Sequence, residues 1–205
     1  DLLTHPYSLS EDSKKFLRKF VFGIPEKPFE KPKVFSFNHF TWTIIKREDK
    51  VGIRFRNLQA KTLLEFKDIE RFKVDSQFRI PARFVAPVEN LIMITNVLGQ
   101  TTEQNKAGTI YFTIKEKEYH LDVIDEGGST YFITFADATS GKSTYGAGRF
   151  IDINKPDAQG NTFIDFNLAY NPPCAFTPFA TCPLPPEQNR LTLAIEAGEK
   201  KYGHH

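Results

Sequence analysis

The sequence predicts a mainly β protein: an antiparallel β-barrel, or a half-open split barrel or sandwich, with a short N-terminal helix and a proline-rich C-terminal segment packed over one end. Roughly seven or eight runs of alternating polar and apolar residues follow one another from position 34, spaced about 8–15 residues apart. No long helical period separates these runs, which is typical of antiparallel sheets. Phe occurs 20 times and 40% of the 205 residues are apolar, so one domain can bury an aromatic core.

The first 33 residues are predicted to differ from the rest of the chain. Residues 10–20 have the spacing of a short amphipathic helix that begins at Ser10. The stretch 23–33 contains three prolines, which lack a backbone donor, so it forms a linker or an extended arm. We therefore expect two parts: residues 1–33, a helix with a proline-rich arm, and residues 34–203, a single β-rich domain.

The elements that follow are predicted to be strands. Residues 34–47 alternate and lead through a turn at 48–50 into a second strand, which indicates a hairpin. A later hairpin is expected where the segment 115–117 turns 108–114 back on 118–124. Further alternating runs cover 78–86, 90–99 and 130–137.

The net charge and the length of the apolar runs indicate whether the protein binds nucleic acid or spans a membrane. The formal net charge of +2 argues against a nucleic-acid binder. No run of about 18 apolar residues occurs, so no transmembrane segment is expected. The chain begins at Asp1 rather than Met, so removal of a leader or of a lipoprotein signal stays an alternative. We favour the cell envelope or periplasm over the cytoplasm.

The string SGKST at 140–144 is not expected to bind phosphate. A phosphate loop needs a further glycine where this chain has Ala136, and no helix follows. The string is predicted instead to be a tight turn, in which Asp137 and Ser140 accept backbone donors and Gly141 adopts positive φ.

Polar residues of the last third suit ligand recognition. If 144–150 is a strand, Tyr145 and Arg149 share one face, and a guanidinium can bind carboxylate or phosphate with two hydrogen bonds. On a strand, Asp165 and Asn167 would also share a face. We predict a site for a small polar or anionic ligand formed by Tyr145, Arg149, Asp165, Asn167, Asn171, Asn189 and Arg190.

A structural role is the alternative for the same residues. Arg149 would then pair inside the fold with Asp137, Asp152 or Asp165. Asn and Asp before consecutive prolines are common turn formers. Asn189 and Arg190 would attach the C-terminal segment to the body.

Cys174 and Cys182 are the only cysteines, and three interpretations stay open for them. They form a disulfide that closes a small loop, as in exported proteins, or they are two free buried thiols. A metal pair is the third, although zinc sites favour closer spacing and no second ligand pair is evident. We therefore predict no metal site, and the sequence leaves any cofactor unknown.

Four segments resemble a family of bacterial and archaeal proteins catalogued as domain of unknown function 1684. Two are TWTIIKREDKVGIRFRNL and FKDIERFKVDSQFRIPARFVAP; the others are FITFADATSGKSTYGAGRFIDI and FIDFNLAYNPPCAFTPFATCPLPPEQNRLTLAIEAGEK. The resemblance covers about Phe40 to Tyr202 and is strongest over Phe132 to Lys200. It implies an uncharacterised protein and no particular reaction.

Three functions remain as hypotheses. The leading one is a β-barrel module that binds a small polar or anionic ligand. The second is an enzyme of unknown reaction, such as a hydrolysis, with Asp165 or Glu187 as base and Arg149 holding the substrate. The third is a structural or partner-binding protein of the cell envelope, which would use the arm at 23–33; a homo-oligomer formed through a sheet edge is compatible with any of them.

Overall fold

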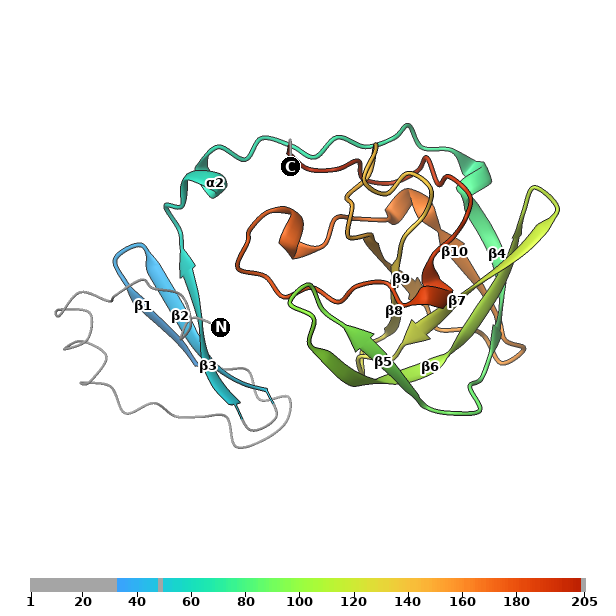
Figure 1. Cartoon of the computed structure of the whole chain (residues 1–205), viewed down its shortest axis with the longest axis horizontal. Coiled ribbons are helices and arrows are strands. Elements are labelled where there is room, and N and C mark those ends of the chain that lie inside the picture. Colours follow the sequence, from blue (N-terminus) through green and yellow to red (C-terminus); the bar gives the residue numbers. More distant parts are fainter. Residues whose placement is uncertain (1–32, 48–49, 204–205) are drawn as a thin grey trace. The chain divides into compact units, whose positions relative to one another are not determined.

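The structure is a computed structural model that describes residues 33–47 and 50–203, and it is mostly β (Figure 1). The strands are β1 (Val34–Phe37), β2 (Phe40–Arg47), β3 (Lys50–Asn57), β4 (Arg79–Val85), β5 (Leu91–Thr95), β6 (Thr101–Ile114), β7 (Lys117–Ile124), β8 (Thr130–Phe135), β9 (Arg149–Asn154) and β10 (Asn161–Asp165). The described helices are α2 (Lys61–Leu64) and four 3-10 turns, η1 (Ser76–Phe78), η2 (Phe166–Leu168), η3 (Pro173–Ala175) and η4 (Glu187–Asn189). The predicted helix at 10–20 lies outside the described residues, as does the predicted arm up to Pro32.

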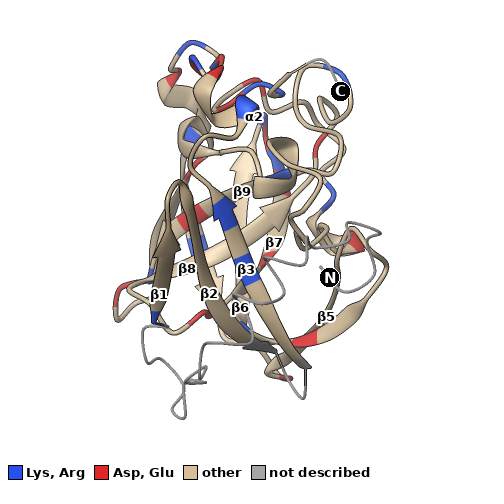
Figure 2. Cartoon of the chain, turned by 90° about the vertical axis from the view of Figure 1, so that its left-hand side faces the viewer, with Lys and Arg blue, Asp and Glu red and all other residues tan. Residues whose placement is uncertain are grey.

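Contacts along the chain divide it into two units, Asp1–Lys67 and Asp68–His205. The described part of the first unit contains an antiparallel sheet in the order β1-β2-β3, so the hairpin predicted from residue 34 is confirmed. Two exposed arginines, Arg54 and Arg56, lie on β3, where basic residues are seen in Figure 2. The domain boundary predicted at 33/34 differs from this division and stays a prediction.

The second unit is a nearly closed antiparallel barrel, which confirms the predicted fold class. Its strands follow the order β10-β4-β6-β7-β8-β9, and β9 lies against β10 to bring the two ends of the sheet together. The additional strand β5 pairs with the first half of β6. Along these strands, buried residues alternate with exposed ones, so the strands form a barrel wall with one face toward the core. On β4, for example, Ile80 and Ala82 are buried whereas Arg79, Pro81 and Arg83 are exposed.

Apolar residues from every strand of this wall fill the barrel, and the C-terminal segment closes it. Ile110, Leu121 and Ile133 are fully buried in this core, and Leu191 and Ile195 from the C-terminal segment pack into the same cluster. In Figure 1 the chain from orange to red runs across the space that the strands enclose in this view. The predicted packing of the C-terminal segment over one end is confirmed.

A second apolar cluster lies on the other face of the wall. Phe132 alternates along β8 with residues of the barrel core, so it points to the opposite face. It packs there with Phe150 of β9 and with Ile92 and Ile94 of β5. Strand β5 therefore covers apolar side chains that would otherwise face water.

The turn between β6 and β7 is one residue shorter than predicted. Lys115 and Glu116 alone form the turn, with φ of 51° and 64°, and Lys117 pairs with Ile114 as the first residue of β7. Two successive residues with positive φ match the twist of a hairpin, but the usual Asn-Gly signal is absent here. The register of β7 is therefore shifted by one residue from the prediction, which exchanges its two faces.

None of the described helices has the length and apolar composition needed to cross a membrane.

Candidate functional site

Arg149 lies in the interior of the second unit, at the first residue of β9, and only 1% of it is exposed. Its Nη2 donates to Asp137 Oδ2 at 2.9 Å and to the carbonyl of Ile195 at 2.9 Å, and its Nη1 donates to the carbonyl of Ala197. Burial lowers the pKa of Arg149, and the charge of Asp137 opposes that shift. The internal Arg–Asp pair is therefore present, with Asp137 as the partner.

The turn after β8 holds Asp137 in position for this pair. Asp137 Oδ1 accepts hydrogen bonds from the Thr139 amide at 2.8 Å and the Thr139 hydroxyl at 2.6 Å. Ser140 Oγ accepts from the Asp137 amide at 3.1 Å, and Gly141 has a φ of 79°. These bonds fix the orientation of the carboxylate that Arg149 contacts.

Asn189 bridges two strands where their ladder stops. β7 and β8 pair only at Ile124 and Phe132. Near that point, Asn189 Oδ1 accepts from the Asp122 amide at 2.7 Å, and Asn189 Nδ2 donates to the carbonyls of Asp122 and Thr134, each at 2.9 Å. The side-chain amide thus takes the place of a peptide group between the strands.

Asn171 holds the end of the C-terminal segment. Its amide and Nδ2 donate to Glu199 Oε2 at 2.7 and 3.0 Å, and Nδ2 also donates to the Lys200 carbonyl at 2.8 Å. The second oxygen of Glu199 accepts from Arg71 at 2.8 Å. One buried carboxylate therefore connects three separate segments of the chain.

Asp165 and Asn167 meet in a turn rather than on a strand face. β10 ends at Asp165, whose Oδ1 accepts from the amide of Asn167 at 3.1 Å and from its Nδ2 at 2.8 Å. Asn167 also exchanges two hydrogen bonds with the backbone of Asp75, at 2.8 and 3.0 Å. These side chains anchor the segment before η1.

Tyr145 and the two cysteines lie together near η3. The Tyr145 hydroxyl donates to the Cys174 carbonyl at 3.1 Å, and burial together with the nearby Cys174 side chain raises the pKa of Tyr145 to about 12. Cys182 Sγ accepts from the Cys174 amide at 3.0 Å, and both thiols are free. Tyr145 precedes β9, so it does not share a strand face with Arg149. The disulfide stays a prediction.

Six of the seven predicted ligand residues are therefore held by hydrogen bonds within the protein, and these bonds favour the structural alternative for them. Arg190 is the exception: its side chain is exposed, and no hydrogen bond or ion pair is found for it within residues 33–47 and 50–203. Glu187, the alternative base, lies exposed at the start of η4. The role of the seven in ligand binding stays a prediction.

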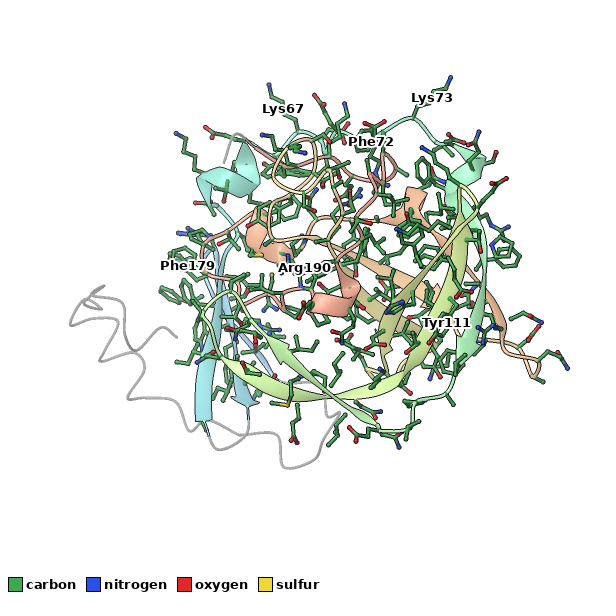
Figure 3. The ribbon with its side chains drawn as sticks, turned by 45° about the vertical axis from the view of Figure 1, so that its right-hand side comes forward. Lys67, Phe72, Lys73, Tyr111, Phe179 and Arg190 are labelled. Atoms are coloured by element: carbon green, nitrogen blue, oxygen red, sulfur yellow. The ribbon has the colours of Figure 1, made fainter. Side chains whose placement is uncertain are left out.

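A hollow of about 580 Å³, which we call the exterior groove, lies on the outer face of the barrel over β10, β4, β6 and β7. Its outward side chains alternate with buried residues of the same strands. They are Pro81, Arg83, Tyr111, Thr113, Glu118, Asn161 and Phe163. Figure 3 shows Tyr111 on the barrel wall, on the side away from Phe179.

Strand register aligns four polar side chains in one row, and the first three of them line this groove. Asn161 pairs with Arg83, Arg83 with Tyr111, and Tyr111 with His120. Residues opposite each other on adjacent strands point to the same face, so the four form one row that spans three strand spacings, roughly 14 Å. The Arg83 guanidinium lies 4.8 Å from the centre of the Tyr111 ring, and the rings of Tyr111 and His120 are 5.8 Å apart.

The arginines of the barrel unit fall into two classes. Arg71 and Arg149 have carboxylate partners at 2.8 and 2.9 Å. Arg79, Arg83 and Arg190 form no ion pair with any residue that the structure describes. Arg79 stacks instead on Phe163, with 4.2 Å between guanidinium carbon and ring centre. The exterior groove thus combines the stacked guanidinium of Arg83, which has no ion-pair partner among the described residues, with amide, hydroxyl and carboxylate side chains.

Sequence reasoning missed the exterior groove because it concentrated on the last third of the chain. Strand alternation does place Arg83 and Tyr111 on one face of their strands. The pairing of Tyr111 with His120, however, depends on the two-residue turn at Lys115 and Glu116, which carries no glycine or asparagine signal.

Metal ligation finds no support in the described part of the chain, where no group of three or more His, Cys, Asp or Glu side chains is arranged to hold an ion.

Together these features define a small antiparallel β-barrel domain, closed by a C-terminal segment that a buried ion pair and two carboxamides, Asn171 and Asn189, hold in place. The chain belongs to the family described as protein of unknown function DUF1684, whose model matches residues 64–200. The predicted membership is confirmed, although the first resembling segment lies before this match.

A solved structure supports the same fold. The solution NMR structure of an uncharacterized protein from Haloarcula marismortui is 29% identical in sequence, with a TM-score of 0.55. The similarity covers 66% of this chain and 77% of that chain. A search of curated proteins found no match.

Proposed function

We propose that the protein is a β-barrel binding module for a small anionic ligand, and that the ligand binds in the exterior groove. The observation that carries this proposal is the guanidinium of Arg83, which has no ion-pair partner in the described part of the chain and is stacked on Tyr111 in the row of four polar side chains. A stacked guanidinium is already oriented, so it loses little freedom when it meets a carboxylate or phosphate.

The size and openness of the groove suit a weakly held metabolite. Its volume of about 580 Å³ lies within the usual range of ligand sites, roughly 300–1,000 Å³. A single exposed ion pair contributes only about 0–1 kcal/mol, so Asn161, Thr113 and Glu118 must add hydrogen bonds to polar groups of the ligand. We expect a dissociation constant between about 1 μM and 1 mM.

An NMR titration of the ¹⁵N-labelled full chain tests the proposal. Citrate, galacturonate and inorganic phosphate are the probes, and the amide signals of Arg83, Tyr111 and Asn161 are expected to shift. Arg83→Ala should weaken binding by about two- to fivefold, because an exposed ion pair contributes up to about 1 kcal/mol.

Arg56→Ala is the matched control, since it removes the same exposed charge from β3, outside the barrel unit. It should bind the probes like the parent chain. Shifts confined to other parts of the barrel, or binding that survives Arg83→Ala unchanged, would contradict the proposal.

A further inference from the structure

A second hollow, which we call the edge slot, adjoins the exterior groove and has a volume of about 190 Å³. It is lined by Lys117, Glu118, Tyr119, His120, Gln188, Arg190, Leu191 and Thr192. Glu118 lines both hollows, and the ring of Tyr111 in the groove contacts the ring of His120 in the slot. The two hollows are therefore neighbours along the same row of side chains.

The edge slot exists because the first half of β7 has no strand partner on one side. β7 meets β8 only at Ile124, and Asn189 occupies the next position by bonding to the backbone of Asp122. Backbone groups alternate in direction along an antiparallel strand, so the N–H and C=O groups of His120 and Glu118 point the same way as those of Asp122. No backbone hydrogen bond joins them to the described segment 188–192.

Charged and polar groups are distributed along the joined hollows in a definite order. The guanidinium of Arg83 lies in the groove and that of Arg190 lies in the slot, and neither has an ion-pair partner among residues 33–47 and 50–203. Between them lie the carboxylate of Glu118 and the phenol of Tyr111. A ligand that follows this path meets a cation, then hydroxyl-binding and acidic groups, then a second cation.

We infer that the exterior groove and the edge slot form one continuous site for a carboxylated oligosaccharide, with one carboxylate on Arg83 and a second on Arg190. This inference rests on the proposed function and names its ligand class. Sugar hydroxyls donate to Glu118 and to the open carbonyls of β7, and the Tyr111 ring supports a sugar face. An ionised polyphosphate chain has only acceptor oxygens, so it cannot donate a hydrogen bond to Glu118 at the junction as a sugar hydroxyl does.

Calorimetric titration of the full chain with digalacturonate and hexagalacturonate tests the inference. The hexamer is expected to bind at least about tenfold more tightly than the dimer, because its second contact forms within the complex. Arg190→Ala should reduce the affinity for the hexamer to that for the dimer and leave dimer binding unchanged. Arg83→Ala should weaken the binding of both.

The controls separate this inference from the proposed function. Arg190→Gln removes the charge but keeps a polar side chain, and it should behave like Arg190→Ala, while Arg56→Ala should match the parent chain. The continuous site is overturned if the hexamer binds no better than the dimer, or if Arg190→Ala does not change the affinity for the hexamer. Neither result contradicts the proposal that a ligand binds in the exterior groove. Tighter binding of an oligothymidylate than of hexagalacturonate overturns the saccharide class. Failure of citrate, phosphate and both galacturonates to bind overturns the proposed function as well.

Discussion

Arg149 and Arg190 show how surroundings decide what the same side chain does. Arg149 is buried and its guanidinium is occupied by Asp137 and by carbonyl groups of the C-terminal segment. Arg190 is exposed and has no carboxylate partner among the described residues. The first holds the fold together, whereas the second is available to a ligand.

Arg149→Ala should therefore lower the free energy of unfolding by about 3–5 kcal/mol, because it leaves Asp137 as a buried, unpaired charge. Arg190→Ala should change it by less than about 0.5 kcal/mol. Urea denaturation followed by circular dichroism measures both. An equal, small effect of the two substitutions would show that the Arg149–Asp137 pair does not stabilise the barrel.

The lowered pKa of Asp122 is expected to make the stability of the fold depend on pH. Burial raises its pKa, but hydrogen bonds from Lys106 at 2.8 Å, Thr109 at 2.6 Å and Gln188 at 2.9 Å outweigh burial, so the pKa lies below the ordinary value of 3.8. A lowered carboxyl pKa stabilises the folded state above the ordinary pKa, and this contribution is lost as the pH falls through the folded-state pKa.

Asp122→Asn should consequently be about 1–2 kcal/mol less stable than the parent chain at pH 7, and the difference should close as the pH falls below 3.8. Denaturant midpoints between pH 7 and pH 2 check this. Glu103→Gln, at an exposed position of β6, should follow the parent chain at every pH. A difference that persists unchanged at pH 2 would assign the effect to packing rather than to charge.

At the scale of elements, the hairpins could be predicted because alternation and turns are local properties. The structural alternative has Asn189 attach the C-terminal segment to the body, but its partners, the backbone of Asp122 and Thr134, could not be predicted because they lie far away in the chain. The predicted turn at 115–117 is one residue longer than the observed turn at Lys115 and Glu116, because Lys and Glu do not indicate positive φ.

Asn189→Ala should cost about 2–4 kcal/mol of stability, because it leaves one buried amide and two buried carbonyls without partners. Asn189→Asp should cost more, since a carboxylate cannot donate to those two carbonyls. Thermal melting compares the variants, with Gln159→Ala on the exposed loop before β10 as the control. An aspartate variant as stable as the parent chain would contradict the bridging role.

The loop that carries Cys174 and Cys182 is expected to close by a disulfide under oxidised glutathione. Burial and the nearby Cys174 thiol raise the pKa of Cys182 to about 12, so the partly exposed Cys174 reacts first and Cys182 then displaces glutathione. The denatured protein should lose two hydrogens in mass, and stability should rise by about 2–3 kcal/mol.

Cys182→Ser is the control for this reaction, because it should stop at a single glutathione adduct on Cys174. Two adducts on the parent chain would instead show that the thiols cannot reach each other.

At the scale of the whole molecule, composition and alternation predict an antiparallel barrel, or a half-open barrel or sandwich, with the C-terminal segment packed over one end. The exterior groove depends on three successive strand registers, which no local pattern determines. The division into units is also a long-range property, because residues just after Lys67 pair with the other end of the chain: Phe72 bonds to Gly198, and Lys200 to Glu70.

The fragment 68–205 is therefore expected to fold without the first unit, with a free energy of unfolding within about 1 kcal/mol of the barrel transition in the full chain. Both apolar clusters lie within this fragment, and so do the bonds of Arg71 and Asp75 to the C-terminal half. The fragment 78–205 is the matched control, because it removes Arg71 and Asp75 and should be less stable by about 2 kcal/mol or more. Urea denaturation and the spread of amide NMR signals measure folding in each case. If the fragment 34–205 folds and 68–205 does not, the first unit is part of the folding domain, and the boundary lies at 33/34 as the sequence predicts.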